Sequence, residues 1–274
     1  MTLRELEERL SSAGIANART EAAILVGHFC GVPFSHVPIM RDSELASASL
    51  DDAVNRRLSG EPLQYILGKW DFMGETYEVS PEVLIPRQDT ETLVEWAITN
   101  IPHGGRFVDL CTGSGCIAIS TLAHRPDLTC VAVEKYPGAL SVARRNASLN
   151  GVADRIEFIE SDVLCGGACE GEFDAVLSNP PYVTADEYGD LHKELFFEPK
   201  YALTDGADGL TFYRRILDVY PPRLKRGSAV VFEIGASQAQ SVSDLAAKHG
   251  MKTQIIKDYS GFDRVAVCTK DGDA

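Results

Sequence analysis

The sequence predicts an α/β protein in which a small helical bundle and a β-hairpin linker precede a mostly parallel, seven-stranded sheet covered by helices. Three observations predict this fold class. Residues 1–70 carry apolar side chains at helical spacing with no strand between them. Residues 71–88 alternate apolar side chains with glycine and proline punctuation, as a hairpin does. In residues 89–274 strand-like and helix-like segments alternate, and βαβ alternation produces a parallel sheet with helices on both faces.

Three amphipathic segments predict the bundle. Thr2 and Glu5 have the spacing of a capping box, and leucines follow at helical intervals. A second segment covers about 17–30 and ends at Gly31. A third covers about 48–58 and stops at the Ser-Gly-Glu-Pro sequence that follows it.

The larger region is assigned segment by segment from the same periodicities. The expected strands are 106–110, 129–134, 156–161, 173–178, 229–234, 253–257 and 264–268. The expected helices are 90–99, 115–124, 138–150, 209–220 and 237–248.

Composition limits the classes of function. The formal net charge of −14 over 274 residues opposes sequence-independent binding of nucleic acid, which depends on phosphate neutralisation, although it leaves room for a local basic patch. The N-terminus is charged from Arg4 and no apolar stretch is long enough to span a bilayer, so we expect a cytoplasmic protein without membrane association. The seven cysteines lack metal-site spacing, so reduced thiols and no metal are expected.

The most informative segment is FDAVLSNPPYV, residues 173–183. A buried strand ends at Ser178, and two prolines then prevent the sheet ladder from continuing. Pro180 biases Asn179 toward extended backbone, at the carboxyl end of a strand, where open α/β sheets bind ligands. The turn presents an amide oxygen and carbonyl groups, which are neutral acceptors suited to an –NH₂ group. On Asn-Pro-Pro-Tyr, residues 179–182, alone, an ordinary proline turn is an equally good explanation.

A glycine-rich turn predicts a nucleotide-like ligand. Gly113 and Gly115 lie between the first strand and a helix, where they allow close approach of a ligand to the backbone. Glu134 ends the second strand, where a carboxylate can accept both hydroxyls of a ribose. Asp162 follows the third strand, where adenine would be recognised. Each acid alone is also explained as a solvated strand end; together they favour an adenosine-bearing cofactor. The candidate cofactor-binding residues are Asp109, Cys111, Thr112, Gly113, Ser114, Gly115, Glu134, Asp162, Val163 and Asn179.

No His, Tyr-Lys or Cys arrangement for hydride chemistry is found elsewhere, which counts against NAD. Asn-Pro-Pro-Tyr at the end of the fourth strand favours S-adenosylmethionine by resemblance. The turn resembles the (D/N/S)-P-P-(Y/F) motif of methyltransferases that act on amide or amino nitrogens. The glycine-rich segment is similar to the class I methyltransferase pattern D-x-G-x-G-x-G, with Cys111 where glycine is usual. The resemblance implies that residues 89–274 form a Rossmann-like, class I methyltransferase domain that binds S-adenosylmethionine.

Further motifs resemble the HemK family, the glutamine N5-methyltransferases of peptide-chain release factors. They are the segments 57–68, 83–91 and 197–203, and the resemblance extends over nearly the whole chain. Gln88 stands where the family usually has proline, and the segment 259–264 is shorter than usual. The resemblance implies methylation of the glutamine in the Gly-Gly-Gln motif of bacterial release factors 1 and 2, with residues 1–70 docking this protein substrate.

In that reading, the side-chain oxygen of Asn179 and the carbonyl of Pro180 accept the two N–H groups of the glutamine. Tyr182 packs against its planar amide, and Pro181 completes the substrate-binding turn. Asn179, Pro180 and Tyr182 are the candidate catalytic residues. Displacement at a sulfonium requires positioning more than a strong base, and no metal.

Rival functions remain open on the sequence alone. A nucleic-acid adenine N6-methyltransferase uses the same Asn-Pro-Pro-Tyr turn but must also bind phosphates and flip a base. A ribosomal-protein glutamine methyltransferase and a non-catalytic adaptor of the termination machinery are the others.

Polar residues beside the predicted domain boundary also allow two interpretations each. Arg87 and Thr90 are candidates to border the cofactor carboxylate, while Asp89 or Thr90 is expected to cap the following helix. Arg57, with Arg56 and Lys69, is a candidate contact for the release factor or an ordinary surface charge.

Overall fold

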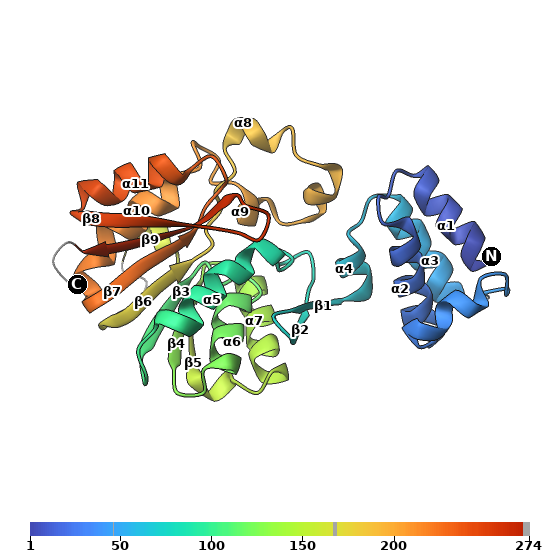
Figure 1. The fold of residues 1–274 in the computed structure, drawn as a ribbon, viewed down its shortest axis with the longest axis horizontal. Coiled ribbons are helices and arrows are strands. Elements are labelled where there is room, and N and C mark those ends of the chain that lie inside the picture. The colour runs from blue at the N-terminus through green and yellow to red at the C-terminus, as the bar shows by residue number, and fades with distance from the viewer. Residues whose placement is uncertain (46, 167–168, 271–274) are drawn as a thin grey trace. The chain divides into compact units, whose positions relative to one another are not determined.

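The computed structural model describes residues 1–45, 47–166 and 169–270. The chain divides into two compact units, each with its own core. The first contains Met1–Lys69 together with His192–Phe197, and the second contains the rest. Figure 1 shows the elements along the chain, with those of the first unit labelled α1 to α4.

The first unit is a helical bundle. Its elements are α1 (Leu3–Ser12), α2 (Ala18–Cys30), η1 (Phe34–Met40), α3 (Ala48–Leu58), α4 (Leu63–Leu67) and η5 (Lys193–Phe197). The capping box at the start of α1 is confirmed, since the Glu5 N–H donates to the Thr2 hydroxyl and the Thr2 N–H donates to the Glu5 carboxylate. Gly31 ends α2 in the left-handed conformation. The short helices η1 and α4 were not predicted, because seven or five residues display little periodicity.

Arg57 does not face a partner as an exposed charge. Its side chain is 5% exposed, and it donates to the Glu21 carboxylate at 2.6 Å and to the Glu61 carbonyl at 3.2 Å. It also pairs with Glu194. Arg56 pairs with the Glu61 carboxylate at the surface. The expectation for Arg57 was therefore wrong: it links parts of the bundle, and a buried guanidinium requires such carboxylate partners.

A β-hairpin begins the second unit. Strands β1 (Lys69–Phe72) and β2 (Glu75–Glu78) are joined by Met73 and Gly74, both with positive φ (55° and 93°), as a two-residue hairpin turn requires. The strands end at Glu78, so residues 79–87 are a loop rather than part of the hairpin.

The predicted seven-stranded sheet is confirmed. Its spatial order is β5-β4-β3-β6-β7-β9-β8, and only the pairs that involve β9 are antiparallel (Figure 1). The strands are β3 (Arg106–Leu110), β4 (Thr129–Glu134), β5 (Ile156–Glu160), β6 (Phe173–Ser178), β7 (Leu224–Glu233), β8 (Met251–Lys257) and β9 (Asp263–Lys270). β7 begins five residues earlier than predicted, because residues 225–227 are exposed and do not show the apolar pattern of a buried strand.

Helices cover both faces of the sheet with separate apolar cores. One core includes side chains of α5 (Glu91–Asn100), α6 (Cys116–His124) and α7 (Pro137–Leu149), and the other includes side chains of α10 (Thr211–Val219) and α11 (Ala239–Lys248). The remaining short elements are η2 (Gln88–Thr90), η3 (Ala153–Arg155), η4 (Val163–Cys165), α8 (Ala185–Tyr188), α9 (Lys200–Leu203) and η6 (Pro221–Arg223).

No single helix within the described part of the chain has the length and apolar composition needed to cross a membrane. The bent pair α2 and η1, with 105° between its helices, passes the same test of length and composition.

The strand order positions the ligand-binding edge. β3 has β4 on one side and β6 on the other, so the direction in which successive strands are added reverses at β3. At such a reversal the loops after neighbouring strands diverge and leave a crevice at their carboxyl ends. The glycine-rich turn, Glu134 and the Asn-Pro-Pro-Tyr turn all lie at this edge.

The backbone after β6 is held by the side chain of Gln238 and approaches Gly209 closely. The amide nitrogen of Gln238 donates to the carbonyl oxygens of Tyr182 (3.1 Å) and Gly209 (3.2 Å). Gly209 has φ +74°, and a Cβ atom there would lie 2.3 Å from the Tyr182 carbonyl oxygen. Only glycine therefore lets these two segments approach so closely.

We predict that Gly209→Ala destabilises the protein far more than Gly206→Ala. Gly206 has a similar φ of +72° but nothing within 4 Å of a Cβ, so its substitution carries only the left-handed penalty of about 1–2 kcal/mol. Gly209→Ala adds an overlap with backbone, which costs a further ~1–3 kcal/mol. Urea denaturation of both variants measures the difference, and equal free energies of unfolding would show that the loop relaxes without cost.

Candidate active site

One pocket lies at the carboxyl edge of the sheet, within the second unit. Its volume is about 900 Å³, including the space at its open mouth. The lining comes from the loop 82–87 with Thr90, the turn 111–114 with the start of α6, the ends of β4 and β5, the turn after β6, and α9 with Phe212.

The glycine-rich turn has left-handed backbone at three alternate positions. Cys111, Gly113 and Gly115 have φ of 62°, 56° and 84°. Cys111 thus adopts the conformation for which the class I pattern uses glycine, and it lines the pocket. Burial raises the pKa of its thiol well above the usual value, so Cys111 presents a neutral, small side chain.

Two predicted cofactor-binding residues lie behind the turn rather than in the pocket lining. Asp109 is fully buried and accepts a hydrogen bond from the Thr112 hydroxyl at 2.5 Å. Burial raises the pKa of Asp109 to about 7 although that hydrogen bond opposes the shift. Gly115 is the N-cap residue of α6, and a Cβ atom there would lie 2.7 Å from Ile119 Cδ1. These residues shape the turn, while Thr112, Gly113 and Ser114 line the pocket.

Glu134 lies at the end of β4 and holds the glycine-rich turn by its carboxylate. It accepts the N–H groups of Gly113 (3.0 Å), Lys135 (2.9 Å) and Tyr136 (3.1 Å). Burial raises the pKa of Glu134 even though these three donors favour its ionised form. The side chain is 7% exposed and lines the pocket, so its carboxylate is fixed in orientation beside the ligand space.

Asp162 and Val163 line the pocket beyond the end of β5. The Asp162 carboxylate accepts the Leu164 N–H at 2.9 Å and pairs with Lys135 Nζ at 2.9 Å. Partial burial opposes its ionisation, but these two partners outweigh burial and hold the pKa of Asp162 below its usual value. Asp162 is therefore a charged acceptor at the pocket wall.

The residues of the turn after β6 line two different pockets. Asn179 and Pro181 line the pocket. Pro180, which stands between them in the sequence, is buried and is not part of the lining. Tyr182 lines a second, open hollow with Gly235 and Gln238. Burial raises the pKa of its phenol, so Tyr182 is a neutral side chain.

Some residues that line the pocket were not among the predicted site residues. Tyr136 and Tyr201 stack with ring centroids 3.6 Å apart, and the Tyr201 hydroxyl donates to the Glu82 carbonyl at 2.7 Å. Glu198 does not line the pocket itself but holds a loop that does: it is buried, accepts the Ile85 N–H at 3.1 Å and pairs with Arg87. The motif 197–203 marked this segment without indicating that it meets the loop 82–87.

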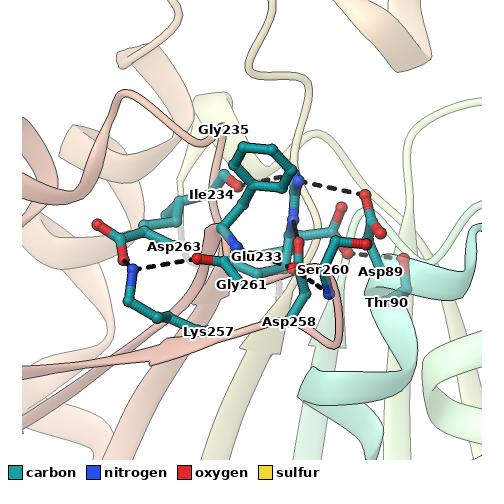
Figure 2. Close-up of polar contacts among 12 residues, drawn as sticks. Asp89, Thr90, Glu233, Ile234, Gly235, Lys257, Asp258, Ser260, Gly261 and Asp263 are labelled. Carbon is teal, nitrogen blue, oxygen red and sulfur yellow. Dashed lines mark hydrogen bonds and ion pairs between the residues drawn. The ribbon is translucent and has the colours of Figure 1, made fainter.

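The capping role expected for Asp89 or Thr90 was wrong. Thr90 is at the N-cap position of α5, but its side chain accepts no hydrogen bond from the helix, and its hydroxyl donates to the Glu233 carboxylate at 2.6 Å. Asp89 pairs with Arg264 at 3.2 Å. Figure 2 shows both residues on the side of the end of β7, at Glu233, and the start of β9, at Asp263. Partners far away in the sequence thus replace the local backbone N–H groups.

Comparison with known proteins identifies the family. Residues 88–229 match the Methyltransferase small domain family and residues 2–68 match the PrmC N-terminal domain family. The release factor glutamine methyltransferase of Moorella thermoacetica is 37% identical, over 96% of this chain and 97% of that protein. The chain belongs to the release factor glutamine methyltransferase family.

A second release factor glutamine methyltransferase, from Geobacter sulfurreducens, is also 37% identical, over 93% of this chain and 91% of its own. Among solved structures, a methyltransferase from Pyrococcus furiosus aligns with a TM-score of 0.54 at 21% identity, over 71% of this chain and 88% of that one. The latter likeness concerns the fold alone. In the described residues of this family member, no cluster of three His, Cys, Asp or Glu side chains is placed to hold a metal ion.

We predict that Asp109→Asn becomes more stable relative to wild type as pH rises from about 5 to 8. Folded Asp109 keeps its proton up to a pKa of about 7, whereas the unfolded chain releases it near 3.8. In this pH window the folded wild type binds one more proton than the unfolded chain, so the free energy of unfolding of wild type falls as pH rises. Asparagine has no such proton, so the difference should change by roughly 1–4 kcal/mol. Urea denaturation at both pH values measures it; a constant difference would place the pKa of Asp109 near its usual value.

Proposed function

We propose that this enzyme transfers a methyl group from S-adenosylmethionine to the side-chain nitrogen of the glutamine in the Gly-Gly-Gln motif of bacterial release factors 1 and 2. The observation that carries the proposal is the position of Asn179 in the same pocket as Glu134 and the glycine-rich turn. An acceptor suited to an amide N–H thus adjoins acceptors suited to a nucleoside.

The side chains that line one end of the pocket fit the cofactor. Glu134 would accept ribose hydroxyls, Asp162 the adenine amino group, and Val133, Val163 and Leu164 would provide apolar contact for the base. The backbone of Gly113 would lie along the methionine portion of the cofactor. S-adenosylmethionine supplies a methyl group on a positively charged sulfur, which an uncharged nucleophile can displace.

The acceptor end fits a primary amide. An amide nitrogen is a weak nucleophile because its lone pair is delocalised into the carbonyl. Asn179 Oδ1 and the Pro180 carbonyl would accept its two N–H groups, and a fixed geometry of this kind lowers the barrier without a strong base. Pro181, which lines the pocket, would support the turn, and Tyr182 would pack at its outer side. The net charge of −14 argues against the rival adenine N6-methyltransferase, which would need to bind nucleic acid.

The helical bundle is proposed to dock the release factor, in a cytoplasmic setting and without a direct nucleic-acid or membrane partner. Support comes from the exposed apolar side chains of η1, Phe34 (59% exposed) and Ile39 (81%). Two such side chains on one short element suit a protein partner better than water.

The first test uses Asn179→Ala with a release factor and S-adenosylmethionine, the methylated residue being located by mass spectrometry. We expect wild type to methylate the glutamine, and the variant to lose about two to three powers of ten in single-turnover rate, the scale for one preorganised hydrogen-bonding group. Binding of S-adenosylmethionine should change less than about threefold. Asn100→Ala removes an exposed amide on α5 and should leave the rate unchanged. Methylation at another residue, or a rate for Asn179→Ala near wild type, would reject the proposal.

The docking role is tested by the double substitution Phe34→Ser and Ile39→Ser. We expect KM for the intact release factor to rise at least about fivefold, because apolar contact area is lost, while cofactor binding stays unchanged. Leu149→Ser, at a 47%-exposed leucine of the second unit, is the matched control and should leave KM unchanged. If KM stays the same in the double variant, η1 has no part in docking.

A further inference from the structure

A chain of hydrogen bonds runs from the end of β7 to Asn179. Glu233 is 1% exposed, and its carboxylate oxygen Oε2 accepts the Thr90 hydroxyl at 2.6 Å. The Thr90 oxygen in turn accepts the Asn179 side-chain N–H at 3.4 Å. The three residues come from β7, from the turn before α5 and from the turn after β6. Thr90 and Asn179 line the pocket, whereas Glu233 lies behind them.

We propose that Thr90 and Glu233 are positioning residues that fix which end of the Asn179 amide faces the substrate. The proposal rests on the proposed function, because it concerns how Asn179 would meet the glutamine. Neither residue is assigned a contact with the reacting atoms.

The direction of the chain follows from the donors that each group has. An ionised carboxylate only accepts, so the single hydroxyl hydrogen of Thr90 must point to Glu233. The Thr90 oxygen then has only lone pairs for Asn179, and only the amide –NH₂ can satisfy them. A reversed amide would set Oδ1 against the hydroxyl oxygen with no hydrogen between them. Asn179 therefore turns Oδ1 away from Thr90, and it is this oxygen that can accept an N–H of the substrate.

The surroundings of Glu233 keep this arrangement in place. Arg264 from β9 pairs with Asp89 (3.2 Å) and Asp258 (3.1 Å) and donates to the Ile234 carbonyl (3.3 Å). Figure 2 shows Asp89, Asp258 and Ile234 around the end of β7. Tyr213 from α10 donates to the backbone carbonyl of Glu233 at 2.9 Å. Burial raises the pKa of Glu233 to about 7, against the effects of Thr90, of Arg264 and of a side-chain hydrogen bond from Asn179 itself. An assay at about pH 8 therefore keeps the carboxylate ionised.

The experiment compares Thr90→Val with Thr90→Ser. Valine has nearly the shape of threonine but no hydroxyl, whereas serine keeps the hydroxyl and loses a methyl group. With saturating S-adenosylmethionine and release factor at about pH 8, we expect Thr90→Val to lower the single-turnover rate about 10- to 100-fold, with cofactor Kd and release-factor KM within about threefold of wild type. Thr90→Ser should stay within about threefold in rate. A loss of structure alone would not separate these two variants while leaving Kd and KM unchanged.

Glu233→Met provides the second arm. Without the carboxylate, the Thr90 hydroxyl is released to donate to Asn179 Oδ1, which would turn the amide –NH₂ toward the substrate. Arg264 retains Asp89 and Asp258, so no unpaired buried charge is created. We expect a rate loss similar to that of Thr90→Val. The double variant with Thr90→Val and Glu233→Met should be no slower than the slower single variant, since both substitutions act through the Asn179 amide.

Three outcomes would overturn the proposal: an active wild type with Thr90→Val within threefold of its rate, a loss in Thr90→Val that lies in cofactor Kd, or losses that multiply in the double variant. If Glu233→Met does not fold, the comparison of valine with serine decides. A wild type that does not methylate the release factor would overturn the proposed function, and this inference with it.

Discussion

The hydrogen bond from Thr90 to Glu233 joins the parts of the sheet edge on which the acceptor end of the site depends. It connects the end of β7 to the turn before α5, and Asn179 then adds the turn after β6. Arg264 brings β9 into the same cluster through Asp89. A buried carboxylate is costly unless it is hydrogen-bonded, so the segments that satisfy Glu233 are held together by its need for partners.

The two halves of the pocket use opposite chemistry. The cofactor half presents carboxylates, Glu134 and Asp162, each oriented by backbone N–H donors. At the acceptor end, Asn179, Pro181 and the Thr90 hydroxyl are neutral groups, and the Glu233 carboxylate lies behind Thr90 and Asn179. This division suits a reaction between a cationic methyl donor and an uncharged amide, because positioning contributes more than proton removal. Gly209 and Gln238 fix the backbone of the same turn from its outer side.

Much of the fold could be predicted from the sequence, because strand periodicity, the capping box and glycine turns are local properties. The edge where Glu134, Asp162 and Asn179 gather also followed, since parallel strands align their carboxyl ends. The roles of Asp89 and Thr90 did not: local spacing indicates a helix cap, but Thr90 donates its hydroxyl to Glu233, 143 residues further along the chain. Nor could spacing show that Arg57 is buried or that Tyr201 meets Tyr136, because both depend on contacts between distant segments.

The orientation of the amide acceptor is tested most directly by a structure of the protein with S-adenosylhomocysteine and a Gly-Gly-Gln substrate, at a resolution near 1.2 Å or better, where amide atoms are distinguished. We expect the glutamine nitrogen within about 3.2 Å of both Asn179 Oδ1 and the Pro180 carbonyl, with Asn179 Nδ2 toward Thr90. A glutamine whose oxygen faces Asn179 Nδ2, or which binds away from this turn, would contradict the central claim.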